Sequence, residues 1–147
     1  MIEDGADIID VGGESTRPGA DQVSDSEELK RVVPVIESIR SKFPDTLISI
    51  DTMKSSVAKQ AVKAGANIIN DVSGLSFDGS MSMTAAKLRV PVIIMHMKGI
   101  PRNMQSNPIY KDLINDISSF FIEKIKLAIE SGIKENLIIL DPGLGFG

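Results

Sequence analysis

The sequence contains no cysteine and no tryptophan, and it has only one histidine and one tyrosine. The absence of cysteine excludes disulfide bonds and thiolate metal sites, and it fits a reducing compartment. The longest apolar runs, 92–95 and 137–140, are far shorter than the roughly 18 residues that a membrane-spanning helix needs. We therefore expect a cytoplasmic protein that does not interact with membranes, with an organellar location left open.

Basic residues are in the minority, with 16 lysines and arginines against 20 aspartates and glutamates and a net charge of −4. Nucleic-acid binding depends on cations that neutralise phosphates, so this balance argues against a nucleic-acid partner. At 147 residues and 42% hydrophobic, the chain is long enough to bury a core. Residues 1–7 are acidic, unlike a signal or transit peptide, and resemble the last turn of a helix that stops at Gly5. We expect residues 1–147 to form one domain that is incomplete at both ends.

A glycine-rich polar stretch follows the first apolar run. Residues 10–20 read Asp-Val-Gly-Gly-Glu-Ser-Thr-Arg-Pro-Gly-Ala. Glycine lets a ligand come close to backbone N–H groups, and Ser15, Thr16 and Arg17 add two hydroxyls and a permanent cation. This composition is typical of a loop that binds an anion or a polar ring, and a polar turn without a ligand would look the same.

Short apolar runs alternate with segments of helical periodicity along the whole chain. Strands are expected at 7–9, 47–51, 67–70, 91–96 and 137–141, and helices at 24–43, 54–64, 81–88 and 110–131. Pro34 predicts a bend in the first helix, and Gly65 predicts the end of the second. The second helix is expected to turn inward Val57, Ala58 and Ala61. The last helix carries an apolar stripe of Leu113, Ile117, Phe121 and Ile125.

Internal repeats support the same organisation. Residues 5–11 and 65–72 are close copies, and 132–141 is a looser third copy: each is a helix stop, a buried strand and a polar strand end. Such units form a parallel sheet covered by helices, either a (β/α)8 barrel or an open doubly wound sheet. We favour the barrel, because it gathers the polar ends of all strands around one site. A barrel needs eight strands and about 250 residues, so the chain is either part of a barrel or an open sheet.

Polar side chains close three of the expected strands, namely Asp51, Asn70 and Asp141. Each has a simple structural explanation: Asp51 suits a helix N-cap, Asn70 a turn, and Asp141 the start of a Pro-Gly turn. In a barrel, however, the three would converge over its C-terminal mouth. Two carboxylates and an amide suit a flat heterocycle with a donor-rich edge, because a carboxylate accepts two parallel N–H bonds.

Five motifs taken together resemble the dihydropteroate synthase family. They are Asp-Val-Gly-Gly-Glu-Ser-Thr-Arg-Pro-Gly at 10–19, Ser-Ile-Asp-Thr at 49–52, Ile-Asn-Asp-Val-Ser-Gly at 69–74, Met-His-Met-Lys-Gly at 95–99, and Asp-Pro-Gly-Leu-Gly-Phe-Gly at 141–147. The resemblance covers essentially the whole chain in the family's order. It implies a (β/α)8 TIM barrel of which about strands two to six are present. It also implies a transferase of folate biosynthesis that joins 4-aminobenzoate to a dihydropterin methyl diphosphate and releases diphosphate.

The resemblance implies roles for individual residues on the pterin side. Asp51, Asn70 and Asp141 match the family's pterin-binding positions. The Asp51 carboxylate would act catalytically, by stabilising the cation that forms as diphosphate leaves. Val72 and Met95 fall near the apolar walls of the pterin slot, where a plain core role is equally open.

A second set of residues matches the family's 4-aminobenzoate subsite. Thr16, Arg17 and Pro18 match a mobile loop that closes over this substrate. Gly145 and Phe146 match the other side of the subsite, where sulfonamide drugs compete in this family.

Four further polar residues near these motifs receive no catalytic role. His96 is the single histidine and has no obvious carboxylate partner, so we expect it to be structural or to anchor a loop. Glu14 is expected to be an acceptor that fixes its own loop. Lys54 and Lys98 lie near the mouth, where exposed lysines are common, and neither is assigned a function.

Parts of the family's site have no counterpart in this sequence. In the family, an Asn on the first strand helps to bind Mg²⁺, and a Lys and an Arg-x-His pair on later strands contact the pterin and the diphosphate. The resemblance therefore implies a magnesium ion whose ligand lies outside this chain, with no metal ligand within it. It also implies a homodimer when the protein is complete, and we expect the chain alone to be inactive.

Two alternatives remain open. A methyltransferase acting on methyltetrahydrofolate and a corrinoid would share the pterin-binding barrel, although the Ser-Thr-Arg-Pro loop and the Gly-Phe-Gly ending argue against it. A catalytically inactive half-barrel scaffold would have a genuine start at Met1 and a stop after Gly147.

Overall fold

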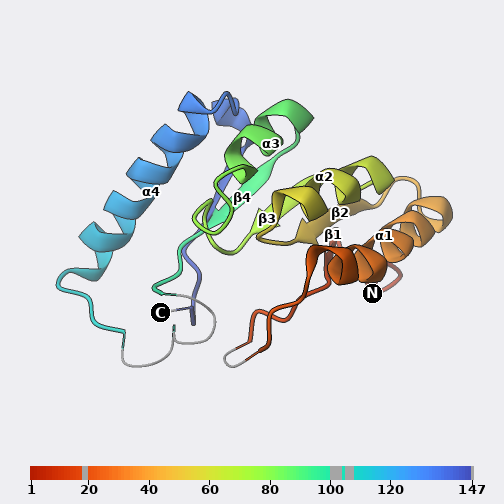
Figure 1. Ribbon diagram of the computed structural model, residues 1–147, viewed down its shortest axis with the longest axis horizontal. Helices are drawn as coiled ribbons and strands as arrows, with labels where there is room; N and C mark the ends of the chain where they lie inside the picture. Colours follow the sequence, from red (N-terminus) through yellow and green to blue (C-terminus); the bar gives the residue numbers. More distant parts are fainter. Residues whose placement is uncertain (18–19, 100–103, 105–107, 147) are drawn as a thin grey trace.

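The computed structural model describes residues 1–17, 20–99, 104 and 108–146, which form a parallel sheet covered by helices (Figure 1). The strands are β1 (Ile8–Gly12), β2 (Leu47–Asp51), β3 (Ile68–Asp71), β4 (Val92–Met95) and β5 (Ile138–Asp141). The helices are α1 (Asp25–Lys42), α2 (Ser55–Ala64), α3 (Met81–Leu88) and α4 (Leu113–Glu130), with a short 3-10 helix at Glu135–Leu137. Every strand and helix expected from the sequence is present.

The strands lie in the order β1-β2-β3-β4-β5, and every neighbouring pair is parallel. Each helix packs against the next one, α1 on α2, α2 on α3 and α3 on α4, so the helices form one layer along the sheet. An open doubly wound sheet would reverse its strand order and carry helices on both faces. The consecutive order therefore confirms the expected partial (β/α)8 barrel.

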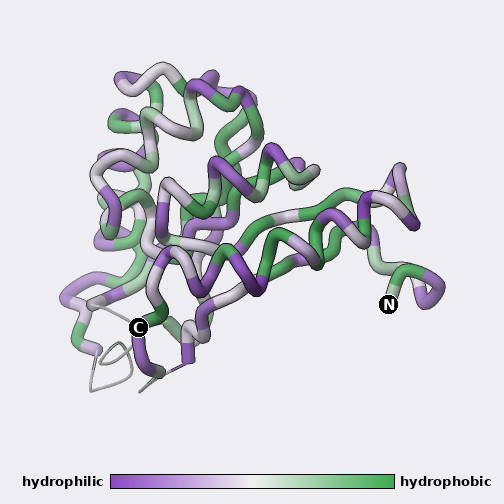
Figure 2. The backbone as a smooth tube through the Cα atoms, turned by 45° about the vertical axis from the view of Figure 1, so that its right-hand side comes forward, coloured by the Kyte–Doolittle hydropathy of each residue, from purple (hydrophilic) through white to green (hydrophobic). Residues whose placement is uncertain are grey.

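The two faces of the sheet differ in how they are covered. The strand side chains buried beneath the helices are Ile9, Val11, Ile48, Ile50, Ile69, Val92 and Ile94. On the other face Ile8, Leu47 and Ile139 are 44%, 45% and 44% exposed. A closed barrel turns this second face inward, so the barrel interior is open here. Figure 2 shows the strands as a hydrophobic centre beside helices of alternating character.

Local sequence signals account for the first two helices. Ser24 caps α1, because its hydroxyl accepts a hydrogen bond from the Glu27 backbone N–H at 3.3 Å. The helix continues through Pro34 without interruption. α2 ends at Gly65, whose φ of +123° favours glycine. The buried face of α2 is the expected one, Val57, Ala58 and Ala61.

β1 is longer than the sequence predicts. The predicted strand stops at Ile9, whereas the observed strand continues to Gly12, because residues 10–12 pair in parallel with residues 49–51 of β2. These residues therefore belong to the sheet, and the glycine-rich loop begins only at Gly13.

α4 starts later than predicted and is incompletely covered. It begins at Leu113 rather than near Tyr110, with Asp112 as its N-cap. The predicted apolar stripe is only partly covered, since Leu113 is 50% exposed and the buried positions are Lys124 and Ala128. The main neighbours of the helix are α3 and β5, and its apolar residues Ile114 and Ile122 are 72% and 69% exposed.

Two glycines let neighbouring loops approach the end of β4 closely. A Cβ on Gly74, which has φ of +58°, would lie 2.6 Å from the Met95 carbonyl oxygen. A Cβ on Gly143, which has φ of +65°, would lie 2.0 Å from the His96 carbonyl oxygen. No side chain fits at these distances, and the left-handed backbone adds strain for other residues. The two glycines thus allow the loops after β3 and β5 to pack against β4.

We expect Gly143→Ala to lower the free energy of unfolding by about 2 kcal/mol or more, because the new methyl group collides with backbone. Gly79→Ala is the matched control, since a Cβ there would meet nothing within 4 Å. Urea denaturation followed by circular dichroism measures both variants. Equal losses in the two would contradict the importance of the close approach.

Candidate functional site

The carboxyl ends of the strands lie at one edge of the sheet, where the predicted pterin residues gather. The loops after β1 and β4 and the segment after β5 leave the sheet at this edge, at the bottom of Figure 1. Parallel pairing sets Asp51 of β2 opposite Gly12 on one side and Asn70 on the other. It also sets Asp141 of β5 opposite Met95 of β4. Four predicted pterin residues therefore stand on the consecutive strands β2 to β5.

Asp51 has a buried carboxylate oxygen without a partner in the described ranges. Its Oδ1 is shielded from solvent and accepts no hydrogen bond from any described residue. Burial, followed by the negative charges of Asp10, Glu28, Asp71 and Glu14, raises the pKa of Asp51 to about 7. A ligand that donates an N–H bond to this oxygen would favour the ionised form. The geometry therefore favours a hydrogen-bond donor next to Asp51.

Asp10 is a site residue that sequence reasoning misses. Its carboxylate accepts one hydrogen bond from the Ser49 hydroxyl and another from the Asn70 side-chain amide at 3.3 Å. These contacts join β1, β2 and β3 and orient the Asn70 amide beside Asp51. The available signal is the alternation of β1, which turns Asp10 toward the open face once the strand includes residues 10–12.

Asp141 takes part in the turn that follows β5. Its Oδ1 accepts a hydrogen bond from the Gly143 backbone N–H at 2.8 Å. Its backbone carbonyl accepts another from the His96 N–H at 2.9 Å, which attaches the turn to β4. One carboxylate oxygen of Asp141 thus has the role expected of the first residue of a Pro-Gly turn. The pterin contact of Asp141 stays a prediction.

An apolar cluster lies beside these polar side chains. Met53, Val72 and Met95 are 9%, 4% and 3% exposed, and Met97 and Phe146 pack against them. The structure therefore brings Val72 and Met95, predicted for the pterin, together with Phe146, predicted for 4-aminobenzoate. An apolar wall next to a few polar groups suits a flat ring that carries N–H donors.

The loop after β1 is fixed at its base by charged side chains. Glu14 Oε2 accepts a hydrogen bond from the Val23 backbone N–H at 3.1 Å and another from Lys54 Nζ at 2.5 Å, so the predicted loop-fixing role of Glu14 is confirmed. Lys54 departs from the pattern of an exposed lysine, because it is only 9% exposed and also contacts Glu28 of α1. Burial lowers the pKa of Lys54, but hydrogen bonds to Glu14 and Glu28 outweigh this and raise it overall.

The residues predicted for the first side of the 4-aminobenzoate subsite lie in this loop. Thr16 borders a small enclosed hollow that Asp51 and Met53 also line. Arg17 is exposed. Pro18 lies outside the described residues.

The residues predicted for the second side lie in the segment after β5. The Phe146 backbone N–H donates to the Gly143 carbonyl at 2.9 Å, and the Phe146 carbonyl accepts from the Lys98 N–H at 3.0 Å. Gly145 has φ of +93° in this turn. Met53 links the two sides, because it borders the hollow beside Thr16 and belongs to the cluster that contacts Phe146. Sequence reasoning misses Met53.

His96 packs against aromatic rings. It is 7% exposed, and its ring meets that of Phe120 of α4 edge-on, with centroids 5.1 Å apart. Burial lowers the pKa of His96, and a hydrogen bond with the Pro142 backbone partly offsets this. Lys98 Nζ lies 3.9 Å from the centroid of the Tyr110 ring. These contacts support the structural role expected for His96.

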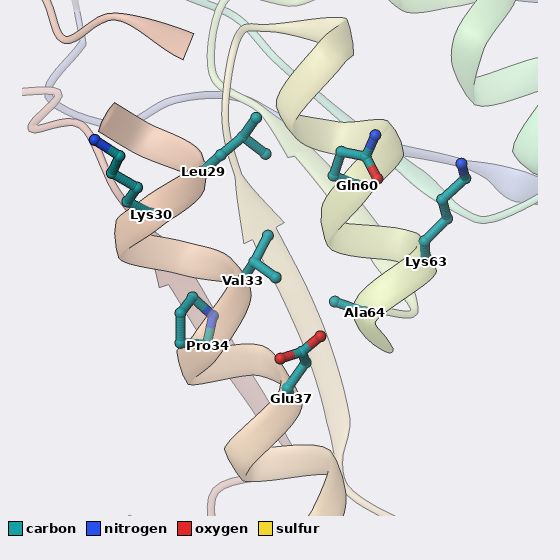
Figure 3. A pocket seen from close by; sticks show the side chains of 8 residues that line it. All are labelled: Leu29, Lys30, Val33, Pro34, Glu37, Gln60, Lys63 and Ala64. Atoms are coloured by element: carbon teal, nitrogen blue, oxygen red, sulfur yellow. The ribbon is translucent and has the colours of Figure 1, made fainter. Parts of the chain in front are cut away.

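Other features of the described residues do not add to this site. Within the described ranges, no three histidine, cysteine or acidic side chains are placed to hold a metal ion. No helix in the same ranges is long and apolar enough to cross a membrane. A hollow of about 520 Å³ lies between α1 and α2 (Figure 3). It is lined by residues of these helices such as Lys30, Val33 and Lys63, and by none of the predicted site residues.

Comparison with known sequences gives matches along the whole chain. The family described as pterin binding enzyme matches residues 1–147. The chain is 48% identical over 147 residues to the dihydropteroate synthase of Haemophilus influenzae and 52% identical over 146 residues to that of Bacillus subtilis. These matches cover 100% and 99% of this chain but 53% and 48% of the relatives. The chain thus spans about half the length of the curated relatives it matches.

Solved structures agree with the sequence matches. The Yersinia pestis dihydropteroate synthase with a sulfonamide drug complex has a TM-score of 0.94 and 48% identity, covering 99% of this chain and 52% of that one. The 7,8-dihydropteroate synthase from Vibrio fischeri has a TM-score of 0.87 and 54% identity, covering 100% and 54%. The family match along all 147 residues and the similar backbone of the solved structures lead to one conclusion: this chain belongs to the pterin binding enzyme family.

Proposed function

We propose that this chain is the pterin-binding half of a dihydropteroate synthase and forms one barrel domain that is incomplete at both ends. The complete protein would join 4-aminobenzoate to a dihydropterin methyl diphosphate and release dihydropteroate and diphosphate. The observation that carries the proposal is the buried Oδ1 of Asp51, which lies beside Asn70 and has no hydrogen-bond partner among the described residues. Solved structures of a related dihydropteroate synthase with 4-aminobenzoic acid and with 7,8-dihydropteroate support the choice of substrates.

The pterin ring would bind through its donor-rich edge. Asp51 accepts N–H bonds from the ring, and the Asn70 amide, oriented by Asp10, both donates and accepts. Val72 and Met95 supply the apolar wall against the ring face. Binding a donor at Asp51 favours its carboxylate, so the ligand brings the catalytic charge into its active form.

The reaction would exchange one bond at the methylene carbon of the pterin. The carbon–oxygen bond to diphosphate breaks, and positive charge develops on the pterin and its methylene group. The amine nitrogen of 4-aminobenzoate then forms a bond to the methylene carbon and releases one proton to solvent. The ionised Asp51 stabilises this charge electrostatically. Thr16, Arg17 and Pro18 would cover 4-aminobenzoate from one side, and Gly145 and Phe146 from the other. Asp141 would complete the pterin contacts from β5.

We propose that the complete protein uses Mg²⁺ and that the ligand of this ion lies in another part of the protein. Among the described residues, no group of three or more histidine, cysteine or acidic side chains is placed to hold a metal ion. We also propose that the complete protein is cytoplasmic and forms a homodimer. Light scattering coupled to size-exclusion chromatography measures the oligomeric state directly.

Synthase activity is tested on the protein encoded by the complete reading frame that contains this chain. We expect it to incorporate radiolabelled 4-aminobenzoate into dihydropteroate, with a sulfonamide competing against 4-aminobenzoate. The isolated 147-residue chain is expected to give no turnover, because it spans about half the length of the relatives. A complete protein that binds a pterin but never consumes 4-aminobenzoate would overturn the proposal.

Titration of Asp51 gives a second test. We expect its carboxyl group to titrate with a pKa of about 7 in the ligand-free protein and at lower pH once a pterin is bound. Carbon-13 NMR of the labelled carboxyl group measures both values. A midpoint near the ordinary carboxyl pKa of 3.8 without ligand would show that burial does not perturb this group.

Asp51→Asn is expected to stabilise the ligand-free protein at neutral and alkaline pH while abolishing pterin binding. Because the folded-state pKa of Asp51 is raised from 3.8 to about 7, the wild-type protein loses stability as the pH rises between these values. The variant avoids this loss, so its advantage should grow by about 4 kcal/mol between about pH 4 and pH 8 and then stay constant. Asp45→Asn, at an exposed position, is the control. Urea denaturation across this pH range measures the difference, and a constant difference would contradict the prediction.

A further inference from the structure

Lys54 joins the two ends of the loop that follows β1. Its ammonium group donates a hydrogen bond to Glu14 Oε2 at 2.5 Å, at the start of the loop, and another to the Val23 carbonyl at 2.5 Å, at its end. Glu14 Oε2 also accepts the Val23 backbone N–H at 3.1 Å. The two ends of the loop therefore share a single cation, and that cation belongs to another part of the chain.

The same cation is held by the scaffold of the barrel. Lys54 directly precedes α2, and its Nζ donates to Glu28 Oε2 of α1 at 2.6 Å. The other oxygen of Glu28 accepts the Thr52 hydroxyl at 2.6 Å, and Glu28 is only 1% exposed. Two carboxylates and one ammonium with so little access to water interact strongly and hold a fixed geometry. The base of the loop is therefore attached to the end of β2 and to α1.

Backbone contacts around Gly13 reinforce this attachment. The Arg31 guanidinium of α1 donates to the Gly13 carbonyl at 3.0 Å. A Cβ on Gly13 would lie 2.8 Å from both Glu28 Cγ and Val32 Cγ1, so the loop leaves β1 in close contact with α1. The two described backbone bonds nearer the loop tip are local, from the Arg17 N–H to Ser15 Oγ and from the Ala20 N–H to the Arg17 carbonyl. The base of the loop is thus charged and buried, whereas these two described bonds beyond it are local.

The hollow beside Asp51 shows what the base positions. Thr16, Glu14 and Lys54 line it together with Asp51. Thr16 follows Glu14 by two residues, so a shift of the Glu14 anchor displaces Thr16 relative to Asp51.

We propose that Lys54 is a positioning residue that fastens both ends of the 13–24 loop to β2 and α1, and thereby sets the place of Thr16 relative to Asp51. Lys54 has no contact with the reacting atoms in this role. Its effect on 4-aminobenzoate rests on the proposed synthase function, whereas its effect on the loop does not.

Hydrogen exchange measured by NMR tests the attachment in the full chain. Lys54→Met removes the cation, and Glu14→Ala removes the loop's anchor while the buried Lys54 keeps its Glu28 partner. We expect the amide of Val23 to exchange at least about tenfold faster in both variants, while the amides of β2 and β3 change by less than about twofold. Lys59→Met, at an exposed position of α2, is the matched control and should leave the loop unchanged.

Each result decides the proposal. Unchanged exchange at the Val23 amide would overturn the proposal. Equal acceleration of exchange in the loop and in the strands would also overturn it, because the contacts of Lys54 would then stabilise the fold in general. If both variants fail to fold, the proposal is overturned for the same reason. In the complete protein, we expect Lys54→Met to raise the KM for 4-aminobenzoate by at least about fivefold with little change in the KM for the pterin substrate. A wild-type protein without synthase activity would refute the proposed function, and the exchange result would stand by itself.

Discussion

The parallel, consecutive pairing of β1 to β5 is the constraint on which the rest of the structure depends. It directs all carboxyl ends to one edge of the sheet, so that polar residues far apart in the sequence become neighbours. The register places Gly12, Asp51 and Asn70 side by side. A Cβ at Gly12 would lie 3.3 Å from Asp51 Oδ2, so the small residue leaves space beside the carboxylate. The pKa of Asp51 follows from this arrangement, because strand pairing buries the group among other carboxylates.

The fold could be predicted because its signals are local. Short apolar runs and a helix-ending Gly65 are properties of short segments, and they are sufficient to predict the order of the elements. The preference for a barrel comes from the polar residues that close several strands. The main site residues were accessible for the same reason. Asp51 and Asn70 stand where an apolar run ends, and parallel pairing brings strand ends together.

What sequence reasoning missed depends on contacts between distant segments. Lys54 meets Glu14 and Glu28, which lie 40 and 26 residues away, and nothing local to Lys54 distinguishes it from an exposed lysine. Asp10 acquires its role only through partners on β2 and β3, after β1 is seen to continue past Ile9. The partial cover of α4 likewise reflects which elements lie next to it rather than its own periodicity.

The apolar wall of the site has a chemical consequence in a protein without cysteine. Three of its five side chains, Met53, Met95 and Met97, carry thioether sulfur. Conversion of such a sulfur to a sulfoxide replaces a flexible apolar side chain by a polar one. One oxygen atom added here would place a dipole against the face of any flat ring in the slot and weaken its binding. Oxidation of these methionines would therefore impair the wall proposed to bind the ligand, in a form that methionine sulfoxide reductases can reverse.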